Sequence, residues 1–448
     1  MFPESDSAVV QVPPSPQELL RALIRYDTSN PPGNERSCLE YVTRTLANGR
    51  IESRLLALEP ERPNLIARVP GRGDAPPLLL YGHIDVVPAH PSEWARPPFK
   101  AEVADGLIWG RGALDMKGGI AMLVCALMRV AAADTQPPGD IILALTSDEE
   151  TGSRTGMEYL VERHASKFDG VRHALSEVGG YTYWHRDRQI VPIQVAEKQR
   201  CVIRATVRGI GGHPALPVPE TASGKLGALL FALAKRRLPV HVTPIVRTVV
   251  DAIAEAMPLR DALLLRALPT PGLTNLLLRA LGEIGALVDP LLHNTATPTL
   301  FRGGVASNVV PSELSVDLDG RVLPGLTPDY LVAELEMVAP RVAEYEIVHI
   351  EPTPPPQPNL DLFPLLARIL RERDSDLIAV PSVLPGYTDA RHVSRLGIQT
   401  YGFLPMRLPR EITMALMHAP DERVPSETLD FGVDCLVEVI RRYEEVAR

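Results

Sequence analysis

The feature that most constrains the fold is an apolar run, residues 77–81, that leads into Gly82-His83-Ile84-Asp85-Val86-Val87. An uncharged run of this length predicts a buried strand, and His83 stands where that strand leaves its sheet. The carboxylate of Asp85 lies on the same face and can hold the second ring nitrogen, which is how metal-ligating histidines are commonly oriented. The segment therefore predicts a strand whose carboxyl end carries a metal ligand.

Four further clusters share this arrangement, with an acid or a histidine after an apolar run or in a glycine-rich loop. They lie at Asp115 in the loop 109–119, at Glu149 and Glu150 after the run 140–146, at Glu177 after the run 173–175, and at His418 in the segment 417–424. Because the strand ends of a parallel sheet share one edge, we expect these side chains to converge although they are far apart in the sequence.

Two histidines and three carboxylates, with one acid to spare, are the ligands expected for a pair of zinc ions. One carboxylate must bridge the two ions, and Asp115 suits the bridge because its glycine-rich loop lets the backbone come close. Glu149 and Glu150 are neighbours and cannot point the same way. One of them can therefore ligate a metal while the other faces the water molecule as general base. Co²⁺ or Mn²⁺ fits the same ligands.

Together these segments resemble the M20 co-catalytic zinc peptidases and deacylases, which include aminoacylases, acetylornithine deacetylases, succinyl-diaminopimelate desuccinylases, and carboxypeptidase G-like and S-like enzymes. The resemblance extends from residues 23–33 to the His418 motif. It implies that one zinc is bound by His83 and Glu177, the other by Glu150 and His418, and both by Asp115.

The same resemblance assigns further roles around these ligands. Asp85 would support His83, and Glu149 would be the general base. A cis peptide bond is implied after the bridging acid, between Asp115 and Met116. The reaction implied is hydrolysis of an amide bond by a metal-activated water molecule, with release of a free amino acid.

The order of the predicted elements indicates one domain interrupted by another. Strands alternate with amphipathic helices up to about residue 195, which predicts an α/β sheet covered by helices. Period-two alternation at 201–209, 313–322 and 345–350, with a helix at 326–338, predicts an α+β open-faced sandwich. We therefore expect a zinc-peptidase-like catalytic domain with a central mixed sheet, formed by residues 1–195 and 353–448. Residues 196–352 would form a lid and dimerisation domain, as the resemblance implies.

Four more site residues are implied by the resemblance. His213, in the segment 209–217, would stabilise the oxyanion, in its own subunit's site or the partner's, although the usual His-Ser-Ser is His-Pro-Ala here. Arg391 would pair with a substrate carboxylate, for which the planar guanidinium is well suited. Asn308 and Arg321 would contact the substrate. The alternative for each is a residue outside the site: an exposed loop histidine, a surface arginine or a turn asparagine.

Between residues 225 and 300 the chain holds apolar helical segments, at 260–268 and 274–281, beyond what a short lid needs. A similar enlargement is found in carboxypeptidase S-like members and N-acyl-amino-acid hydrolases. These helices could form a pocket for a hydrophobic acyl group or side chain, or they could pack on the lid or on a second subunit. Packing is the expected outcome, because apolar helical stripes are usually buried in a core.

Composition narrows the partners and the compartment. The 448 residues are too many for one core, and the net charge of −9 argues against nucleic acids and anionic membranes as partners. The four cysteines have no paired spacing, so we expect buried free thiols and a reducing compartment. The segment 1–14 lacks the apolar core of a signal peptide, and no uncharged run is long enough to span a membrane. We therefore expect a cytoplasmic protein, and the resemblance, with its lid domain, implies a homodimer.

Three functions remain open from the sequence. The first is a deacylase of N-acyl amino acids, and the second is a di- or carboxypeptidase of the same family. The third is a catalytically inactive protein that binds amino-acid-like ligands, which would be expected to lack a ligand or the base.

Overall fold

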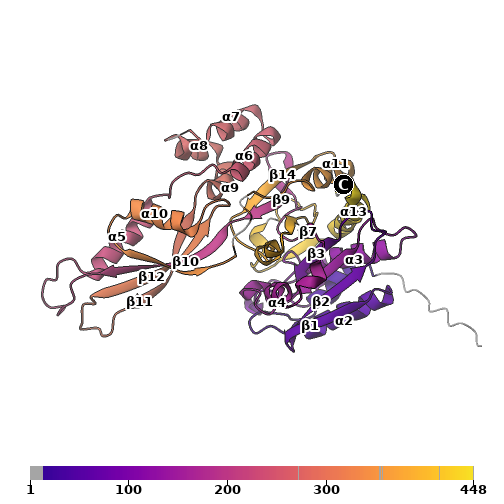
Figure 1. Ribbon diagram of the computed structural model, residues 1–448, viewed down its shortest axis with the longest axis horizontal. Helices are drawn as coiled ribbons and strands as arrows, with labels where there is room; N and C mark the ends of the chain where they lie inside the picture. The colour runs from indigo at the N-terminus through magenta and orange to yellow at the C-terminus, as the bar shows by residue number, and fades with distance from the viewer. Residues whose placement is uncertain (1–13, 271, 353–354, 356, 413, 447–448) are drawn as a thin grey trace, which may run out of the picture. The chain divides into compact units, whose positions relative to one another are not determined.

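The computed structural model describes residues 14–270, 272–352, 355, 357–412 and 414–446, and its contacts divide the chain into two units (Figure 1). Unit 1 comprises Met1–Val195, Asn359–Val380 and Thr388–Arg448, and unit 2 comprises Ala196–Pro358 and Pro381–Tyr387. The chain thus enters unit 2 where the sequence analysis placed the first boundary. It returns six residues later than expected, and 381–387 also groups with unit 2.

Unit 1 is built on a mixed sheet with the strand order β1-β2-β6-β3-β7-β15-β9-β14, and β8 pairs with β9. The strands are β1 (Ser53–Glu59), β2 (Arg62–Val69), β3 (Leu78–His83), β6 (Ile141–Thr146), β7 (His173–Ser176), β8 (Tyr183–His185), β9 (Arg188–Glu197), β14 (Leu377–Leu384) and β15 (Gln399–Gly402). A small second sheet is formed by β4 (Glu102–Ala104), β5 (Leu107–Trp109) and β16 (Arg423–Pro425). The predicted central mixed sheet is confirmed.

The centre of the unit 1 sheet is parallel. Strand β3 pairs in parallel with β6 on one side and with β7 on the other, and β7 pairs in parallel with β15. All residues of β3, β6 and β7 are buried, as expected for strands covered on both faces. The carboxyl ends of these strands therefore lie along one edge, where the residues that follow them meet.

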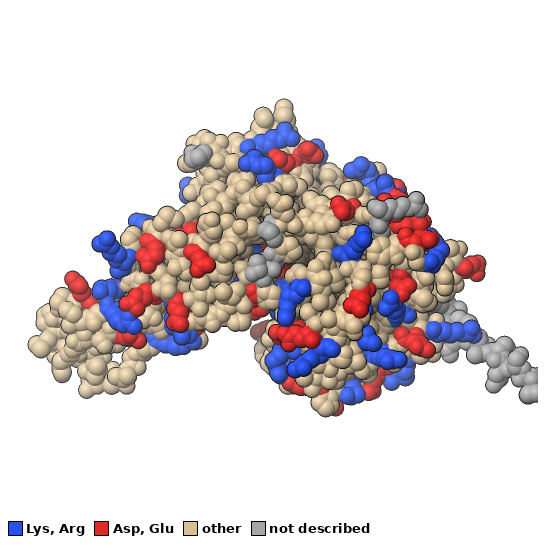
Figure 2. Space-filling model, in the orientation of Figure 1, with Lys and Arg blue, Asp and Glu red and all other residues tan. Residues whose placement is uncertain are grey.

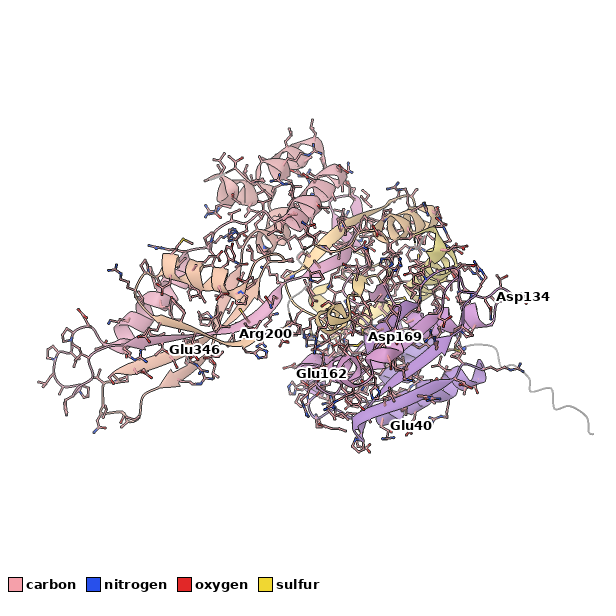
Figure 3. All side chains as sticks on the ribbon, viewed as in Figure 1. Glu40, Asp134, Glu162, Asp169, Arg200 and Glu346 are labelled. Atoms are coloured by element: carbon pink, nitrogen blue, oxygen red, sulfur yellow. The ribbon has the colours of Figure 1, made fainter. Side chains whose placement is uncertain are left out.

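Helices cover this sheet, and each has buried side chains on at least one of its faces. They are α1 (Pro16–Ile24), α2 (Arg36–Asn48), α3 (Lys117–Ala131), α4 (Met157–Arg163), α11 (Phe363–Arg373), α12 (Ala390–Val393) and α13 (Ser426–Arg442). In α2, Leu39 and Val42 are fully buried, while Glu40 points to solvent (Figure 3). Helix α3 is buried along nearly its whole length, because it packs against β3 and β6 as well as α1 and α13.

Unit 2 contains an antiparallel sheet with the order β11-β12-β10-β13. Its elements are β10 (Gln199–Arg208), α5 (Ala222–Lys235), β11 (Thr295–Gly303), β12 (Glu313–Val322), α10 (Pro328–Val338) and β13 (Glu344–Ile350). One face packs on α5 and α10 through a core that includes Ile203, Leu318 and Leu331. The other face carries cross-strand ion pairs such as Arg204–Asp317. This is the predicted open-faced sandwich.

Four consecutive helices form the enlargement of unit 2: α6 (Pro244–Ala256), α7 (Leu259–Ala267), α8 (Thr274–Leu281) and α9 (Glu283–Leu292). Their buried residues, such as Val249, Leu265 and Val288, lie where these helices pack on one another. Whether the helices form a substrate pocket or a packing surface stays a prediction. Leu259 and Leu276 are 76% and 64% exposed, so the apolar character is not confined to the interior.

The surface and the cysteines agree with the composition. On the face shown in Figure 2, acidic and basic side chains lie among one another. The predicted buried free thiols are confirmed at Cys38, Cys125, Cys201 and Cys435. Of the helices in the described residues, none combines the length and apolar character needed to cross a bilayer.

Truncation of Leu143 to alanine tests how much the parallel centre contributes to stability. Leu143 is fully buried in β6 and is paired with Leu80 of β3. Leu143→Ala is expected to lower the free energy of unfolding by about 2–5 kcal/mol, because it leaves a cavity in a closely packed core. Urea denaturation followed by circular dichroism measures the change. The control, Leu58→Ala at a 48% exposed position in β1, should cost far less, and equal losses would contradict the assignment.

Candidate metal centre

The candidate site lies at the carboxyl edge of the parallel strands in unit 1. His83 is the last residue of β3, and Glu177 follows β7 directly. Glu149 and Glu150 begin a short turn after β6, and Asp115 lies in the loop between β5 and α3. The fifth predicted ligand, His418, comes from the loop before β16, whose pairing with β5 brings the end of the chain to the Asp115 loop.

Asp115 stands between the two histidines. Its Oδ1 lies 3.1 Å from Nε2 of His83, and its Oδ2 lies 3.1 Å from Nε2 of His418. Glu177 Oε2 is 3.4 Å from Nε2 of His83, and Glu150 Oε1 is 3.2 Å from Nε2 of His418. The structure therefore brings the five predicted ligands close together, and their division between two metals stays a prediction. The peptide bond between Asp115 and Met116 is cis, as expected.

The donor set fits a pair of divalent cations. Imidazole nitrogens and carboxylate oxygens are ligands of zinc, and they converge here from the strand edge and two loops. Ligand atoms of His83, Asp115 and Glu150 lie within 4.8 Å of one another, as do those of His83, Glu149 and Glu177. The protein's own charges are poorly balanced here, since four carboxylates surround two histidines. Two divalent cations would neutralise that excess.

The same crowding shifts the pKa values of these groups. Burial raises the pKa of the Glu177 carboxyl to about 7, against the attraction of His83. Burial, and then the charge of Glu177, raises the pKa of Glu149 well above its ordinary value. Hydrogen bonds to Asp115 and Glu150 raise the pKa of His418 to about 10. The carboxylates of Glu149, Glu150 and Glu177 are thus costly to ionise, and both imidazolium ions are favoured. Asp115 differs, because hydrogen bonds to His418 and His83, acting against its burial, lower the pKa of its carboxyl.

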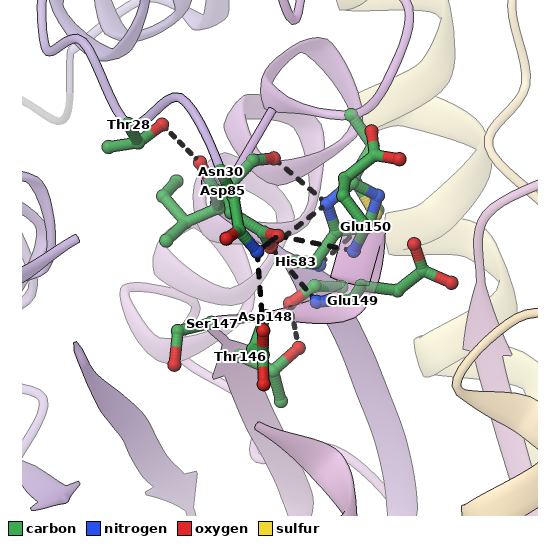
Figure 4. A network of polar contacts seen from close by, with 12 residues as sticks. Thr28, Asn30, His83, Asp85, Thr146, Ser147, Asp148, Glu149 and Glu150 are labelled. Atoms are coloured by element: carbon green, nitrogen blue, oxygen red, sulfur yellow. Dashed lines mark hydrogen bonds and ion pairs between the residues drawn. The ribbon is translucent and has the colours of Figure 1, made fainter. Parts of the chain in front are cut away.

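Asp85 supports two parts of the site (Figure 4). The Nδ1 of His83 lies 3.0 Å from the backbone oxygen of Asp85 and 3.5 Å from its Oδ1. A proton on Nδ1 directs the free Nε2 toward Asp115 and Glu177. The carboxylate also accepts hydrogen bonds from the backbone N–H groups of Glu149 and Glu150, each at 3.2 Å. Asp85 therefore fixes the turn that carries the two glutamates as well as the histidine.

Two buried residues that the sequence analysis did not single out complete this network. Asn30 donates from Nδ2 to Asp85 Oδ2 at 2.8 Å, and it lies just before the proline pair in the segment 23–33. Asp389 accepts a hydrogen bond from Thr146 Oγ1 at 3.0 Å and another from Ser153 Oγ. Asp389 is part of the segment 386–391, whose acid could have been noticed beside its arginine.

Arg391 is only 2% exposed and bonds within its own unit. Its Nη1 donates to the backbone oxygen of Thr388 at 2.8 Å, and its Nη2 donates to Ser153 Oγ at 3.3 Å. The guanidinium thus holds the loop that follows the two glutamates, and Asp389 binds the same serine. Recognition of a substrate carboxylate by Arg391 stays a prediction.

The other three predicted residues belong to unit 2. His213 is exposed in the loop after β10, where its Nδ1 accepts from the backbone of Ala215 at 3.2 Å. Asn308 is exposed in the turn between β11 and β12, and a bridge between Gly212 and Val310 brings its loop beside that of His213. Arg321 lies on β12. Its Nε donates to Asp319 Oδ1 at 2.6 Å, and its guanidinium lies 4.8 Å from the Tyr387 ring centre.

His392, next to Arg391, provides a pH-dependent prediction. It is buried, and neither ring nitrogen has a hydrogen-bond partner among the described residues. Burial, and then repulsion by Arg391 and Arg395, lowers the pKa of His392 to about 3 from 6.5. As the pH falls, His392 therefore binds a proton at a higher pH in the unfolded chain than in the folded one. The stability associated with a neutral His392 is complete above pH 6.5 and is lost as the pH falls toward 3.

We expect His392→Phe to reduce the slope of the free energy of unfolding against pH in this range by up to about 1.4 kcal/mol per pH unit. Urea denaturation of the variant and the wild type at steps between pH 7 and pH 4 measures the two slopes. His90→Phe, at an exposed position, is the control and should leave the slope unchanged. Parallel curves for His392→Phe and the wild type would contradict the prediction.

Comparisons with known proteins bear on the whole chain. A family model described as peptidase family M20/M25/M40 matches residues 79–442. The probable carboxypeptidase S-like 2 of Dictyostelium discoideum is 26% identical over 380 residues, covering 82% of this chain and 72% of that protein. The N-fatty-acyl-amino acid synthase/hydrolase PM20D1 of Xenopus tropicalis is 26% identical over 374 residues, with the same coverage of 82% and 72%.

A solved structure shows the same fold. The M20 family metallo-carboxypeptidase Sso-CP2 of Sulfolobus solfataricus matches with a TM-score of 0.66 at 18% identity. The match covers 96% of this chain and 100% of that chain, so both units have counterparts there.

Proposed function

The chain belongs to peptidase family M20/M25/M40 and is a metal-dependent hydrolase, and from this premise we propose that it is a dinuclear-metal amidohydrolase. Its reaction is hydrolysis of the amide bond in an N-acyl amino acid or a small peptide, with release of a free amino acid. The observation that supports the proposal is the position of Asp115, whose two oxygens each face a different histidine at 3.1 Å.

The proposed metals are two Zn²⁺ ions, with Co²⁺ or Mn²⁺ suited to the same donors. His83 and Glu177 would hold one, Glu150 and His418 the other, and Asp115 both. When bound, such a pair lowers the pKa of a water molecule and polarises a substrate carbonyl.

The protein's own part in the reaction is proton transfer. Glu149 takes a proton from the attacking water and delivers it to the departing amine. Burial, and then the charge of Glu177, raises the pKa of Glu149, which is the direction in which enzymes shift a glutamate base. Asp85 holds the backbone of Glu149, which fixes where that carboxylate can reach. His213 as the oxyanion donor, and Arg391, Asn308 and Arg321 as substrate contacts, stay predictions.

Two relatives support different substrates. One is named as carboxypeptidase S-like and the other as an N-fatty-acyl-amino acid synthase/hydrolase. We propose a deacylase of N-acyl amino acids first and a di- or carboxypeptidase second. The inactive ligand binder is set aside, because all five proposed ligands and the base Glu149 are present.

The substrate class is tested by amine release from a mixed panel of short-acyl and long-acyl amino acids and dipeptides. Each substrate is assayed with Zn²⁺ or Co²⁺, and again after chelation. Turnover of acyl amino acids that is lost on chelation and restored by metal is the expected result. Preference for dipeptides would favour the peptidase, and turnover unaffected by chelation would contradict the proposal.

Metal removal is also expected to lower stability. Binding of one ion at 100 times its Kd adds about 2.7 kcal/mol to the free energy of unfolding, provided that the unfolded chain does not bind it. Thermal unfolding of chelator-treated protein should therefore shift to higher temperature as Zn²⁺ or Co²⁺ is added. Mg²⁺ is the control and should shift the unfolding temperature less, because it prefers oxygen ligands to the imidazole nitrogens of this site. Equal curves with and without Zn²⁺ would contradict the site.

A homodimer and a cytoplasmic location complete the proposal. The four buried free cysteines support a reducing compartment. Light scattering at micromolar concentration tests the dimer, and a monomer mass would remove it.

A further inference from the structure

Glu422 is a fully buried carboxylate close to the candidate site that the proposed mechanism does not use. Its Oε1 accepts hydrogen bonds from the backbone N–H groups of Leu114 at 2.6 Å and Asp115 at 3.0 Å. Its Oε2 accepts from the backbone N–H of Gly112 at 3.0 Å. One side chain thus binds three backbone donors of the loop that carries the bridging acid.

Arg111, which is 3% exposed, pairs with this carboxylate and continues the connection. Its Nη1 donates to Glu422 Oε2 at 2.8 Å and to the backbone oxygen of Ala419 at 3.2 Å. Its Nη2 donates to the backbone oxygen of His418, also at 3.2 Å. The arginine comes from the Asp115 loop and holds the His418 loop, while the glutamate comes from the His418 loop and holds the Asp115 loop.

This reciprocal arrangement lies where two loops distant in the sequence must be held together. His418 is exposed through 54% of its side chain, so little packing holds its ring apart from the contacts of Nε2 with Asp115 and Glu150. The backbone of His418 is held by Arg111 instead. On the other side, the peptide groups on both sides of Leu114 are fixed by Glu422.

Resting on the proposed function, we propose that Arg111 and Glu422 are a positioning pair that sets the separation between Asp115 and His418 and thereby couples the two metal positions. Burying an ion pair costs free energy because both charges lose their water, and further hydrogen bonds are needed to offset that loss. Here the Glu422 carboxylate accepts hydrogen bonds from four donors. Loss of the pair would leave buried N–H groups without acceptors in the loop that carries the bridge.

Glu422→Gln and Arg111→Lys test the pair, with Co²⁺ as the probe. An amide at position 422 presents an NH₂ group to one side of the cluster, where N–H donors already lie, whichever way it is turned. Lysine at position 111 keeps the charge but lacks the fork that reaches Glu422 and two carbonyl oxygens together. Co²⁺ binding is followed by calorimetry and visible absorption, and the fold by far-UV circular dichroism.

We expect two Co²⁺ ions per wild-type chain. In Glu422→Gln, affinity for at least one of them should be about 10–100-fold weaker, the usual cost of losing a partner that orients a ligand. Asp317→Asn is the matched control, because Asp317 is also a buried carboxylate paired with arginine, in unit 2. It should lower stability without changing Co²⁺ affinity.

A double-mutant cycle locates the effect. Arg111→Lys should weaken binding about 10–100-fold when added to Glu177→Gln, which leaves the His418 position as the main site. The same change should cost little when added to Glu150→Gln, where that position has already lost a ligand. Equal costs in both backgrounds would overturn the assignment to His418.

Other outcomes are equally decisive. Folded Glu422→Gln and Arg111→Lys proteins that bind two Co²⁺ ions with wild-type affinity would overturn the positioning role alone. If both variants fail to fold, the pair belongs to the fold and the inference is overturned. Wild-type protein that binds no Co²⁺ would overturn the proposed function, and this inference with it.

Discussion

Glu149→Gln is expected to lower kcat by about 10²–10⁴-fold, the usual contribution of a general base, while the metal content stays at two per chain. The amide keeps the size of the side chain but cannot accept the proton from water. Among the described residues, no ion pair joins Glu149 to His83 or His418, whereas Glu150 Oε1 lies 3.2 Å from His418 Nε2. The base can therefore be removed without loss of a ligand.

The measurement combines steady-state kinetics on the best substrate of the panel with metal analysis of the same sample. Glu162→Gln is the control, since Glu162 is an exposed glutamate on α4 (Figure 3), and it should keep wild-type kcat. Glu149→Gln with wild-type kcat would remove the base assignment. Loss of metal in the same variant would instead make Glu149 a ligand.

Asp115→Asn is expected to reduce the amount of bound metal more than a substitution of any other of the five proposed ligands. Asparagine offers one neutral oxygen where aspartate has two anionic ones facing different histidines. After dialysis, the variant should retain close to no metal, and its kcat/KM should fall by more than the ~10–100-fold that follows loss of an orienting partner.

Glu177→Gln and Glu150→Gln provide the comparison, because each contacts one histidine. Each should retain one metal ion per chain by elemental analysis. If Asp115→Asn also retains one ion, Asp115 is not shared between the two positions. Circular dichroism of the metal-free proteins shows whether the variants are folded.

The sheet edge could be predicted because its signal is local. Strands β3, β6 and β7 contain no Asp, Glu, Lys or Arg. His83 ends β3, Glu177 follows β7 directly, and Glu149 comes three residues after the end of β6. A charged side chain is costly to bury, so a fully buried strand and the charged site residues that follow it lie close together in the sequence. The same reasoning reached the helices α7 and α8 through their apolar stripes, but it did not separate α9, which contains Pro290.

The contacts that orient the ligands could not be predicted in the same way. Glu422 and Asp85 bind backbone N–H groups, which every residue except proline offers, so no residue pattern marks the partner. Asp85 was expected to hold His83, yet β3 ends at His83 and the chain turns. That turn lets the carboxylate reach the glutamates 64 and 65 residues away as well.

The order of the sheet has a consequence for synthesis on the ribosome. Strand β15 lies between β7 and β9 in space, but it is made after the residues Ala196–Pro358 of unit 2. At ~5–20 residues per second, that interval lasts on the order of ten seconds. During it the sheet is open beside β7, and His418 does not yet exist. The nascent chain therefore carries His83, Asp115 and Glu177, the residues of the first proposed metal position, well before His418, which would complete the second.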